Sequence, residues 1–116
     1  MSEIIETIIK QAYAAFNARN TDAVLVYMQP NVHWPNGWEG GYVEGHEAVR
    51  DYWTRQWNEI DPEVEPVSFT YLPDGRTLVN VHQKVKNKQG AVLFDGTVLH
   101  LYTFENGLIN SMEISQ

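Results

Sequence analysis

The sequence predicts an α+β domain in which helical segments come first and strands follow. Apolar residues recur at three- and four-residue steps before about residue 60, and they alternate with other residues after it. The chain has 116 residues, of which 43% are hydrophobic, and this is enough apolar material for one folded core. No repeat, low-complexity tract or linker interrupts it. We therefore expect a single domain over residues 1–116.

Three helices are expected in the first half. The first covers Glu3–Ala18, where one apolar stripe repeats with helical spacing. Asn20 is placed to cap a short second helix over Asp22–Met28. The third covers His46–Asn58, has an unusually aromatic face, and ends before Pro62 because the residue preceding a proline is disfavoured in a helix.

Strands are expected where apolar residues alternate between turn signals such as Asn106-Gly107, a strong two-residue hairpin signal. Two of them are short and separate the second and third helices, and the others form a meander after the third helix. The expected strands are Val32–Trp34, Tyr42–Glu44, Val67–Tyr71, Leu78–Val85, Ala91–Phe104 and Leu108–Ser115.

The composition disfavours several classes of function. The 8 Lys and Arg residues against 15 Asp and Glu residues give a formal charge of −7, which disfavours binding to nucleic acid or to an anionic membrane surface. The chain has no Cys, and so no disulfide and no thiolate metal site. No apolar run is long enough to cross a bilayer, and the first residues lack the basic start of a secretory signal. We therefore expect a cytoplasmic protein.

Three segments, in this order, resemble the nuclear transport factor 2-like superfamily, in its SnoaL-like and ketosteroid isomerase-like branch. They are Tyr13–Asn17 with the following Asp22-Ala23, the run Gly45–Trp53, and Phe104–Ile109. The run Gly45–Trp53 is the most specific of them. The resemblance implies a single SnoaL-like domain shaped as a cone, in which a curved antiparallel sheet wraps around three N-terminal helices (a cystatin-like roll). It also implies a pocket at the open end and a homodimer formed through the outer face of the sheet.

His100 is the leading catalytic candidate. Alternate side chains of the strand Ala91–Phe104 lie on opposite faces, and matching this strand to the family's strand implies that His100 faces the pocket. An imidazole of near-neutral pKa can pass a proton or donate a hydrogen bond at working pH. The alternative is a structural histidine that is hydrogen-bonded to a backbone carbonyl or to a helix side chain.

Two further ionisable residues are weaker candidates. Asp95 is the only carboxylate within the long strand; alternation turns it outward, but a bulge at Gly96 would swing it inward as a general base. The alternative is a solvated aspartate. His33 lies beside Trp34 near the expected pocket mouth, and a surface histidine is the alternative there.

Aromatic residues are abundant for a chain of this length and predict a flat apolar pocket. The alternative is that these rings only fill the core. Trp38, in a glycine-rich loop, is expected to act either as a flap or as an interface residue. The residues expected to bind the substrate are Tyr13, Trp34, Trp53, Trp57, Gln83, Val98 and Tyr102.

The sequence predicts no metal or cofactor site. The four histidines never fall at the close helical spacing of metal ligands. His46 and Glu47 begin like a zinc-protease motif, but Arg50 stands where the second histidine would have to be. No nucleophile elbow and no phosphate-binding loop is present.

Three positions depart from the pattern of the ketosteroid isomerases, which combine a carboxylate base with a tyrosine and a protonated aspartate. Trp34 stands where the family has its base, Ala12 where it has the tyrosine, and His100 where it has the aspartate. Steroid isomerisation in that form is therefore not expected. A SnoaL-like arrangement, with a base on the sheet and aromatic residues around the ligand, is compatible with His100 and the tryptophans.

Two functions remain open from the sequence. One is a small-molecule-binding protein of the SnoaL-like group, acting as an enzyme of proton-transfer chemistry (isomerase, cyclase, dehydratase or hydrolase) on a mainly apolar organic substrate. The other is a non-catalytic protein-binding or accessory module, which would use the acidic surface and loop aromatics such as Trp38 and Tyr42.

Overall fold

The structure, a computed structural model, describes residues 2–115 and has the predicted α+β order. Its helices and strands follow one another along the chain as α1 (Ser2–Asn17), α2 (Thr21–Leu25), β1 (Met28–Pro35), β2 (Tyr42–Glu44), α3 (His46–Glu59), β3 (Ile60–Tyr71), β4 (Thr77–Asn87), β5 (Val92–Glu105) and β6 (Leu108–Ser115). No helix within these residues is long and apolar enough to cross a membrane.

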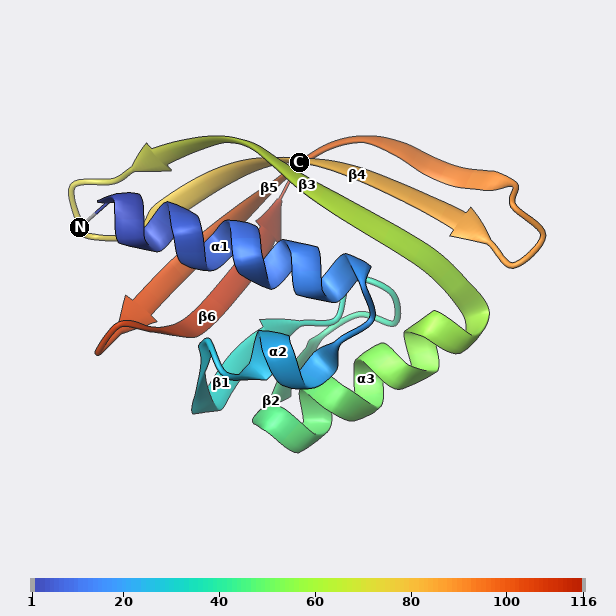
Figure 1. Cartoon of the computed structure of the whole chain (residues 1–116), viewed down its shortest axis with the longest axis horizontal. Coiled ribbons are helices and arrows are strands. Elements are labelled where there is room, and N and C mark those ends of the chain that lie inside the picture. Colours follow the sequence, from blue (N-terminus) through green and yellow to red (C-terminus); the bar gives the residue numbers. More distant parts are fainter. Residues whose placement is uncertain (1, 116) are drawn as a thin grey trace.

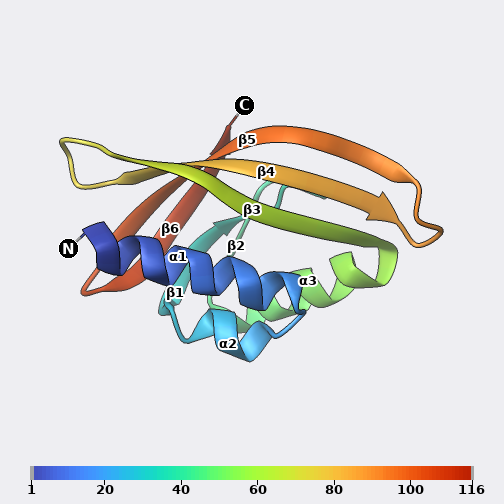
Figure 2. The same ribbon diagram turned by 45° about the horizontal axis from the view of Figure 1, so that its top comes forward.

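The strands form one six-stranded sheet in the order β2-β1-β6-β5-β4-β3. The long strands β3, β4 and β5 curve over α1, and α2 and α3 lie on the same side of the sheet (Figures 1 and 2). The expected curved antiparallel sheet is confirmed except at one pairing. β1 pairs with β6 in parallel, while all other pairings are antiparallel, so the sheet is mixed.

The helices follow the sequence pattern closely at the start of the chain. Ile9, Ala12 and Tyr13 lie on the buried stripe of α1. Asn20 caps α2 as expected, because its side-chain oxygen accepts a hydrogen bond from the backbone N–H of Ala23 at 3.2 Å. α2 is shorter than predicted: it ends at Leu25, since the chain already enters β1 at Met28.

β1 and β3 are longer than predicted, because both strands continue through prolines that the prediction left outside them. β3 begins directly after α3 and includes Pro62 and Pro66, which pair with Val85 and Val81 of β4. It is an edge strand of the sheet. A proline is tolerated there because its missing N–H faces away from the neighbouring strand. α3 therefore ends before the prolines, as expected, and β3 begins at the next residue, Ile60.

A β-bulge interrupts the pairing of β4 with β5, but not at Gly96, where the sequence analysis considered one. The register runs unbroken through Gln83–Gly96 and Lys84–Asp95. It shifts where Val85 pairs with Phe94 and the next residue of β4 pairs with Val92, so that Leu93 is the extra residue. A bulge re-aims side chains locally, and here two consecutive residues, Leu93 and Phe94, both line the interior cavity.

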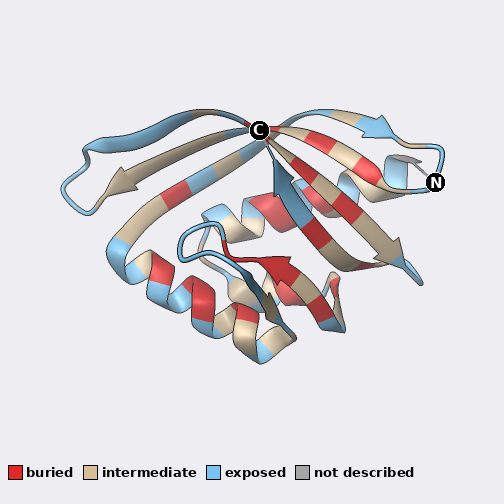
Figure 3. Cartoon of the chain, turned by 180° about the vertical axis from the view of Figure 1, so that it is seen from behind, coloured by how far each residue is buried: buried red, intermediate tan, exposed pale blue. Residues whose placement is uncertain are grey.

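The core lies between the concave face of the sheet and the helices. Buried positions alternate along β4 and β5, and they recur along one side of α3 (Figure 3). The buried apolar residues include Ile9, Val49, Trp53, Val79, Val81 and Tyr102.

Candidate ligand-binding cavity

A cavity of about 390 Å³ lies inside the cone. Its volume falls in the range of small-molecule sites. Among the described residues, no lysine, arginine, aspartate or glutamate lines it. The polar side chains of the lining are Tyr13, Trp34, Trp38, Tyr52, Trp53, Gln56, Gln83, His100 and Tyr102. The cavity is therefore apolar and uncharged, with a few hydrogen-bonding groups.

A chain of hydrogen bonds crosses the buried wall of the cavity. The hydroxyl of Tyr102 donates to the hydroxyl of Tyr13 at 2.7 Å, and the Tyr13 hydroxyl lies 2.6 Å from Nδ1 of His100. α1 supplies Tyr13, while β5 supplies His100 and Tyr102, which are two residues apart and so share a face. The family pattern places its tyrosine at the position of Ala12. In this chain the tyrosine that contacts the imidazole is the next residue, Tyr13.

With Tyr102 as the donor to Tyr13, one tautomer of His100 is favoured. Because Tyr102 donates to Tyr13, the proton of the Tyr13 hydroxyl is free to go to Nδ1 of the imidazole. A neutral imidazole whose Nδ1 accepts a hydrogen bond carries its own proton on Nε2. Within residues 2–115, no hydrogen bond is found for this Nε2–H. His100 therefore presents an unused donor at a wall of the cavity.

Burial keeps this imidazole neutral. It lowers the pKa of His100 from 6.5 to about 4, because the charged form loses its hydration. Burial also raises the pKa values of Tyr13 and Tyr102. The near-neutral pKa assumed for His100 in the sequence analysis therefore does not hold in this environment. Near pH 7 the imidazole is a hydrogen-bond donor and a weak base.

Trp34 and Trp53 both line the cavity, as expected. Their rings meet edge to face with centroids 5.8 Å apart, and Trp34 also lies 6.3 Å from the ring of Tyr102. Trp57 is not part of the lining. It packs behind Trp53 and against Phe16, at centroid distances of 5.8 and 5.2 Å. Trp57 thus supports the aromatic wall and does not form it.

The structure places the other predicted residues in two groups. Gln83 and Val98 line the cavity from β4 and β5. Asp95 lies outside it: the carboxylate is exposed and 2.6 Å from Nε2 of His82, whose hydrogen bond lowers the pKa of Asp95. His33 is also outside the lining, stacked on the ring of Tyr42 with centroids 4.2 Å apart. Neither position supports a role for Asp95 or His33 inside the cavity.

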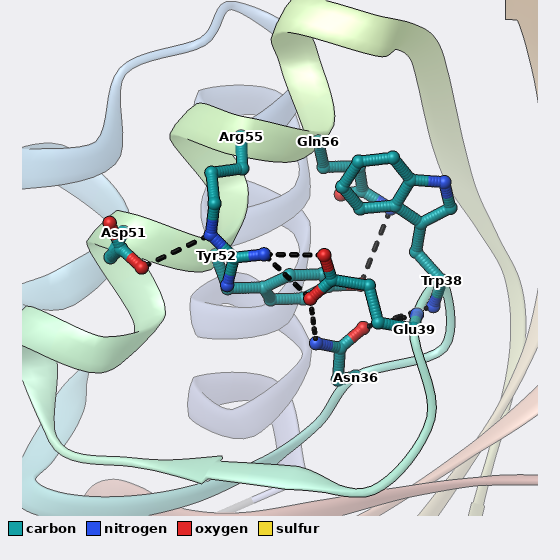
Figure 4. Close-up of polar contacts among 7 residues, drawn as sticks. All are labelled: Asn36, Trp38, Glu39, Asp51, Tyr52, Arg55 and Gln56. Atoms are coloured by element: carbon teal, nitrogen blue, oxygen red, sulfur yellow. Dashed lines mark hydrogen bonds and ion pairs between the residues drawn. The ribbon is translucent and has the colours of Figure 1, made fainter.

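The loop of residues 36–41 contributes to the cavity wall. From the sequence, the role of its Trp38 was open between a flap and an interface residue. Trp38 lines the cavity from this loop. The carboxylate of Glu39 lies between the amide of Asn36 and the guanidinium of Arg55 (Figure 4), with contacts of 2.9 Å to Asn36 and 2.5–2.6 Å to Arg55. Asn36-Gly37 signals a turn in the sequence, but nothing in the sequence pairs Glu39 with Arg55 across sixteen residues.

α3 adds a second polar patch beside this loop. The amide of Gln56 donates to the hydroxyl of Tyr52 at 3.3 Å, one turn earlier on the helix. Burial raises the pKa of Tyr52 to about 12, although hydrogen bonds from the backbone of Trp38 and Gly37 act in the opposite direction. Tyr52 therefore stays protonated at neutral pH and contributes to the cavity as a neutral group.

Comparisons with known proteins identify the family and confirm the fold. A family model described as a SnoaL-like domain matches residues 9–112. A search of curated proteins gives no match.

Solved structures share the fold at low identity. An NTF2-like protein of unknown function from Burkholderia pseudomallei is 24% identical; the alignment covers 99% of this chain and 91% of that one, with a TM-score of 0.83. TerC, co-crystallised with polyporic acid, is 25% identical over 97% of this chain and 89% of its own, with a TM-score of 0.82. A Catenulispora acidiphila protein of ketosteroid isomerase-like fold, in complex with trimethylamine, is 15% identical over 94% and 84%, with a TM-score of 0.80. The predicted fold is confirmed.

Proposed function

We propose that this protein, which belongs to the SnoaL-like domain family, binds a small, uncharged, mainly apolar organic molecule in its cavity. One observation carries the proposal: among residues 2–115, a cavity of about 390 Å³ without charged lining residues contains the ring of His100, for whose Nε2 no hydrogen bond is found. An ionised ligand would lose its hydration there without gaining an opposite charge. A neutral ligand with an acceptor oxygen would gain apolar burial and one hydrogen bond.

His100 would recognise a carbonyl or a similar oxygen of the ligand. The bonds from Tyr102 to Tyr13 and from Tyr13 to Nδ1 keep the imidazole in the tautomer that donates from Nε2. In a low-dielectric site such a chain also strengthens the final donor. Polar anchoring at one point and apolar contact elsewhere is the usual design of small-molecule sites.

If the ligand is turned over, His100 would stabilise negative charge on that oxygen rather than abstract a proton. A neutral donor placed where charge develops lowers the barrier of steps that form an enolate or an alkoxide. By contrast, an imidazole with a pKa of about 4 is a poor base near pH 7. Isomerisation and cyclisation through an enolate suit this arrangement, and the base would be a substrate group or a water molecule.

The ligands of two structural neighbours support the binding of a small organic molecule, but they do not bear on its charge, because trimethylamine is a cation near pH 7. TerC was crystallised with polyporic acid, and the Catenulispora acidiphila protein is in complex with trimethylamine. Both ligands are small organic molecules. The homodimer through the outer face of the sheet remains a prediction, which analytical ultracentrifugation would check.

The test uses three naphthalene probes that differ at one substituent. Trp34 and Trp53 line the cavity, so tryptophan fluorescence reports binding. We expect 2-acetylnaphthalene to bind roughly fivefold more tightly than 2-ethylnaphthalene, because only the ketone accepts a hydrogen bond. The anion 2-naphthoate should bind more weakly than either probe.

The matched variants are His100→Phe and His82→Phe, two histidines on neighbouring strands of which only the first lines the cavity. His100→Phe should abolish the preference for the ketone, and His82→Phe should retain it. Absence of saturable binding for all three probes would reject the proposal and favour the protein-binding alternative.

A further inference from the structure

The cavity has an outer part that differs from the wall around His100. Three lining residues are also substantially exposed and mark an opening: Trp38 is 36% exposed, Phe94 37% and Leu93 58%. Ile114 is 40% exposed and lines the cavity too, but it pairs with His100 itself. By contrast, His100 is only 5% exposed. A ligand that enters beside Leu93 and Phe94 would therefore have its inner end near His100 and its outer end at this opening.

Two features of β5 build this opening. The β-bulge at Leu93 turns both Leu93 and Phe94 toward the cavity. Gly96 then leaves room for the aromatic ring, because a Cβ at that position would lie 3.2 Å from the ring of Phe94. The ring thus lies over the glycine, and the outer part of the cavity has a flat apolar surface.

Gln83 supplies the hydrogen-bonding group of this outer part. It lies opposite Gly96 in the register of β4 and β5, and its side chain lines the cavity. No hydrogen bond of its amide is found within residues 2–115. The amide can both donate and accept, so it can pair with a hydroxyl, a carbonyl or an amide of a ligand.

The register gives the spacing of the two polar groups. His100 pairs with Val79, and Gln83 lies four residues further along β4. At the rise of a β-strand this separates them by roughly 13 Å along the sheet. Val98, which lies between them in the register and lines the cavity, is buried and apolar. Two hydrogen-bonding groups are therefore held at the ends of an apolar wall.

We infer that the cavity takes an elongated, flat, uncharged molecule with an acceptor oxygen at its inner end and a hydrogen-bonding group at its outer end. This inference rests on the proposed function and narrows its ligand class. His100 would hold the inner oxygen, and Gln83 would hold the outer group. The apolar middle of the molecule would lie along Val98, and the ring of Phe94 would cover its outer part.

Three uncharged aromatic ketones test the inference by calorimetry and tryptophan fluorescence. Acetophenone reaches only the inner group, 4-acetylbiphenyl spans the wall, and 4-acetyl-4′-hydroxybiphenyl adds a hydroxyl at the far end. We expect the hydroxylated probe to bind roughly fivefold more tightly than 4-acetylbiphenyl. Gln83→Leu should remove this difference, because a leucine side chain cannot hydrogen-bond the hydroxyl. Gln89→Leu, in the exposed turn between β4 and β5, is the control and should preserve the difference.

The outcomes separate this inference from the proposed function. If acetophenone binds but neither biphenyl does, the outer part is closed and only the inference fails. Equal affinities of the two biphenyls, or a hydroxyl effect that survives in Gln83→Leu, also overturn it while the small-molecule site stands. If none of the three ketones binds, both the inference and the proposed function fail.

Discussion

Mild acid should destabilise the protein through His100. In the folded chain its pKa is lowered to about 4 by burial, against 6.5 for an ordinary imidazole. Between these values the unfolded chain binds a proton that the folded chain does not, so the free energy of unfolding falls as the pH falls. The contribution of the neutral His100 to this free energy is present above about pH 6.5 and is lost progressively toward about pH 4. From about pH 7.5 to about pH 5, the two pKa values give a loss of about 2 kcal/mol.

Urea unfolding followed by tryptophan fluorescence measures this loss directly. The comparison needs the wild type, His100→Gln and His82→Gln at both pH values. His100→Gln removes the titrating group, while the glutamine oxygen can still accept the hydrogen bond of Tyr13. His82→Gln changes an exposed histidine of the next strand and should behave like the wild type.

The refuting result is equal loss in the wild type and His100→Gln, because the imidazole would then titrate alike in folded and unfolded chains. A second measurement needs no variant. In an NMR titration the ring protons of His100 should keep their neutral chemical shifts down to about pH 5. If they titrate near pH 6.5 in the folded protein, the imidazole is hydrated and the neutral donor proposed for the cavity does not exist.

Three further changes give distinct readouts. Tyr13→Phe should lower the free energy of unfolding by about 2 kcal/mol in urea titrations, since the buried hydroxyl of Tyr102 loses its acceptor. The same variant should weaken binding of 2-acetylnaphthalene in calorimetry, because the tautomer of the imidazole is no longer fixed. Gly96→Ala should weaken binding of 4-acetylbiphenyl but spare acetophenone, as its Cβ displaces the ring of Phe94. Asp95→Asn should leave the affinity for all these ketones unchanged, because the carboxylate is outside the cavity. A clear loss of affinity would show that Asp95 takes part in binding.

Much of the fold could be predicted from the sequence because its signals are local. The apolar stripe of α1, the cap at Asn20 and the hairpin at Asn106-Gly107 each depend on residues close in the chain. The errors arose where a distant partner overrides a local signal. Proline at positions 62 and 66 predicts irregular chain, yet β3 continues through both because only one of its sides is paired.

The site could be predicted only in part, because some of its features are local in the sequence and others depend on distant partners. Alternation on β5 and the family resemblance together pointed to the face that carries His100, Val98 and Tyr102. The bond between Tyr13 and His100 joins residues 87 positions apart, and the contact of Glu39 with Arg55 joins a loop to a helix. Spacing along the chain does not encode such contacts. The lowered pKa of His100 follows from burial, which only the packed structure supplies.

The parallel pairing of β1 with β6 has a consequence for the order of folding. Within residues 2–115, β6 follows the other strands along the chain and lies between β1 and β5 in the sheet. Until β6 is in place, β1 and β2 have no pairing with the strands that follow α3, so the six-stranded sheet cannot be completed. A nascent chain stalled before residue 108 should therefore remain sensitive to protease, however complete its helices are.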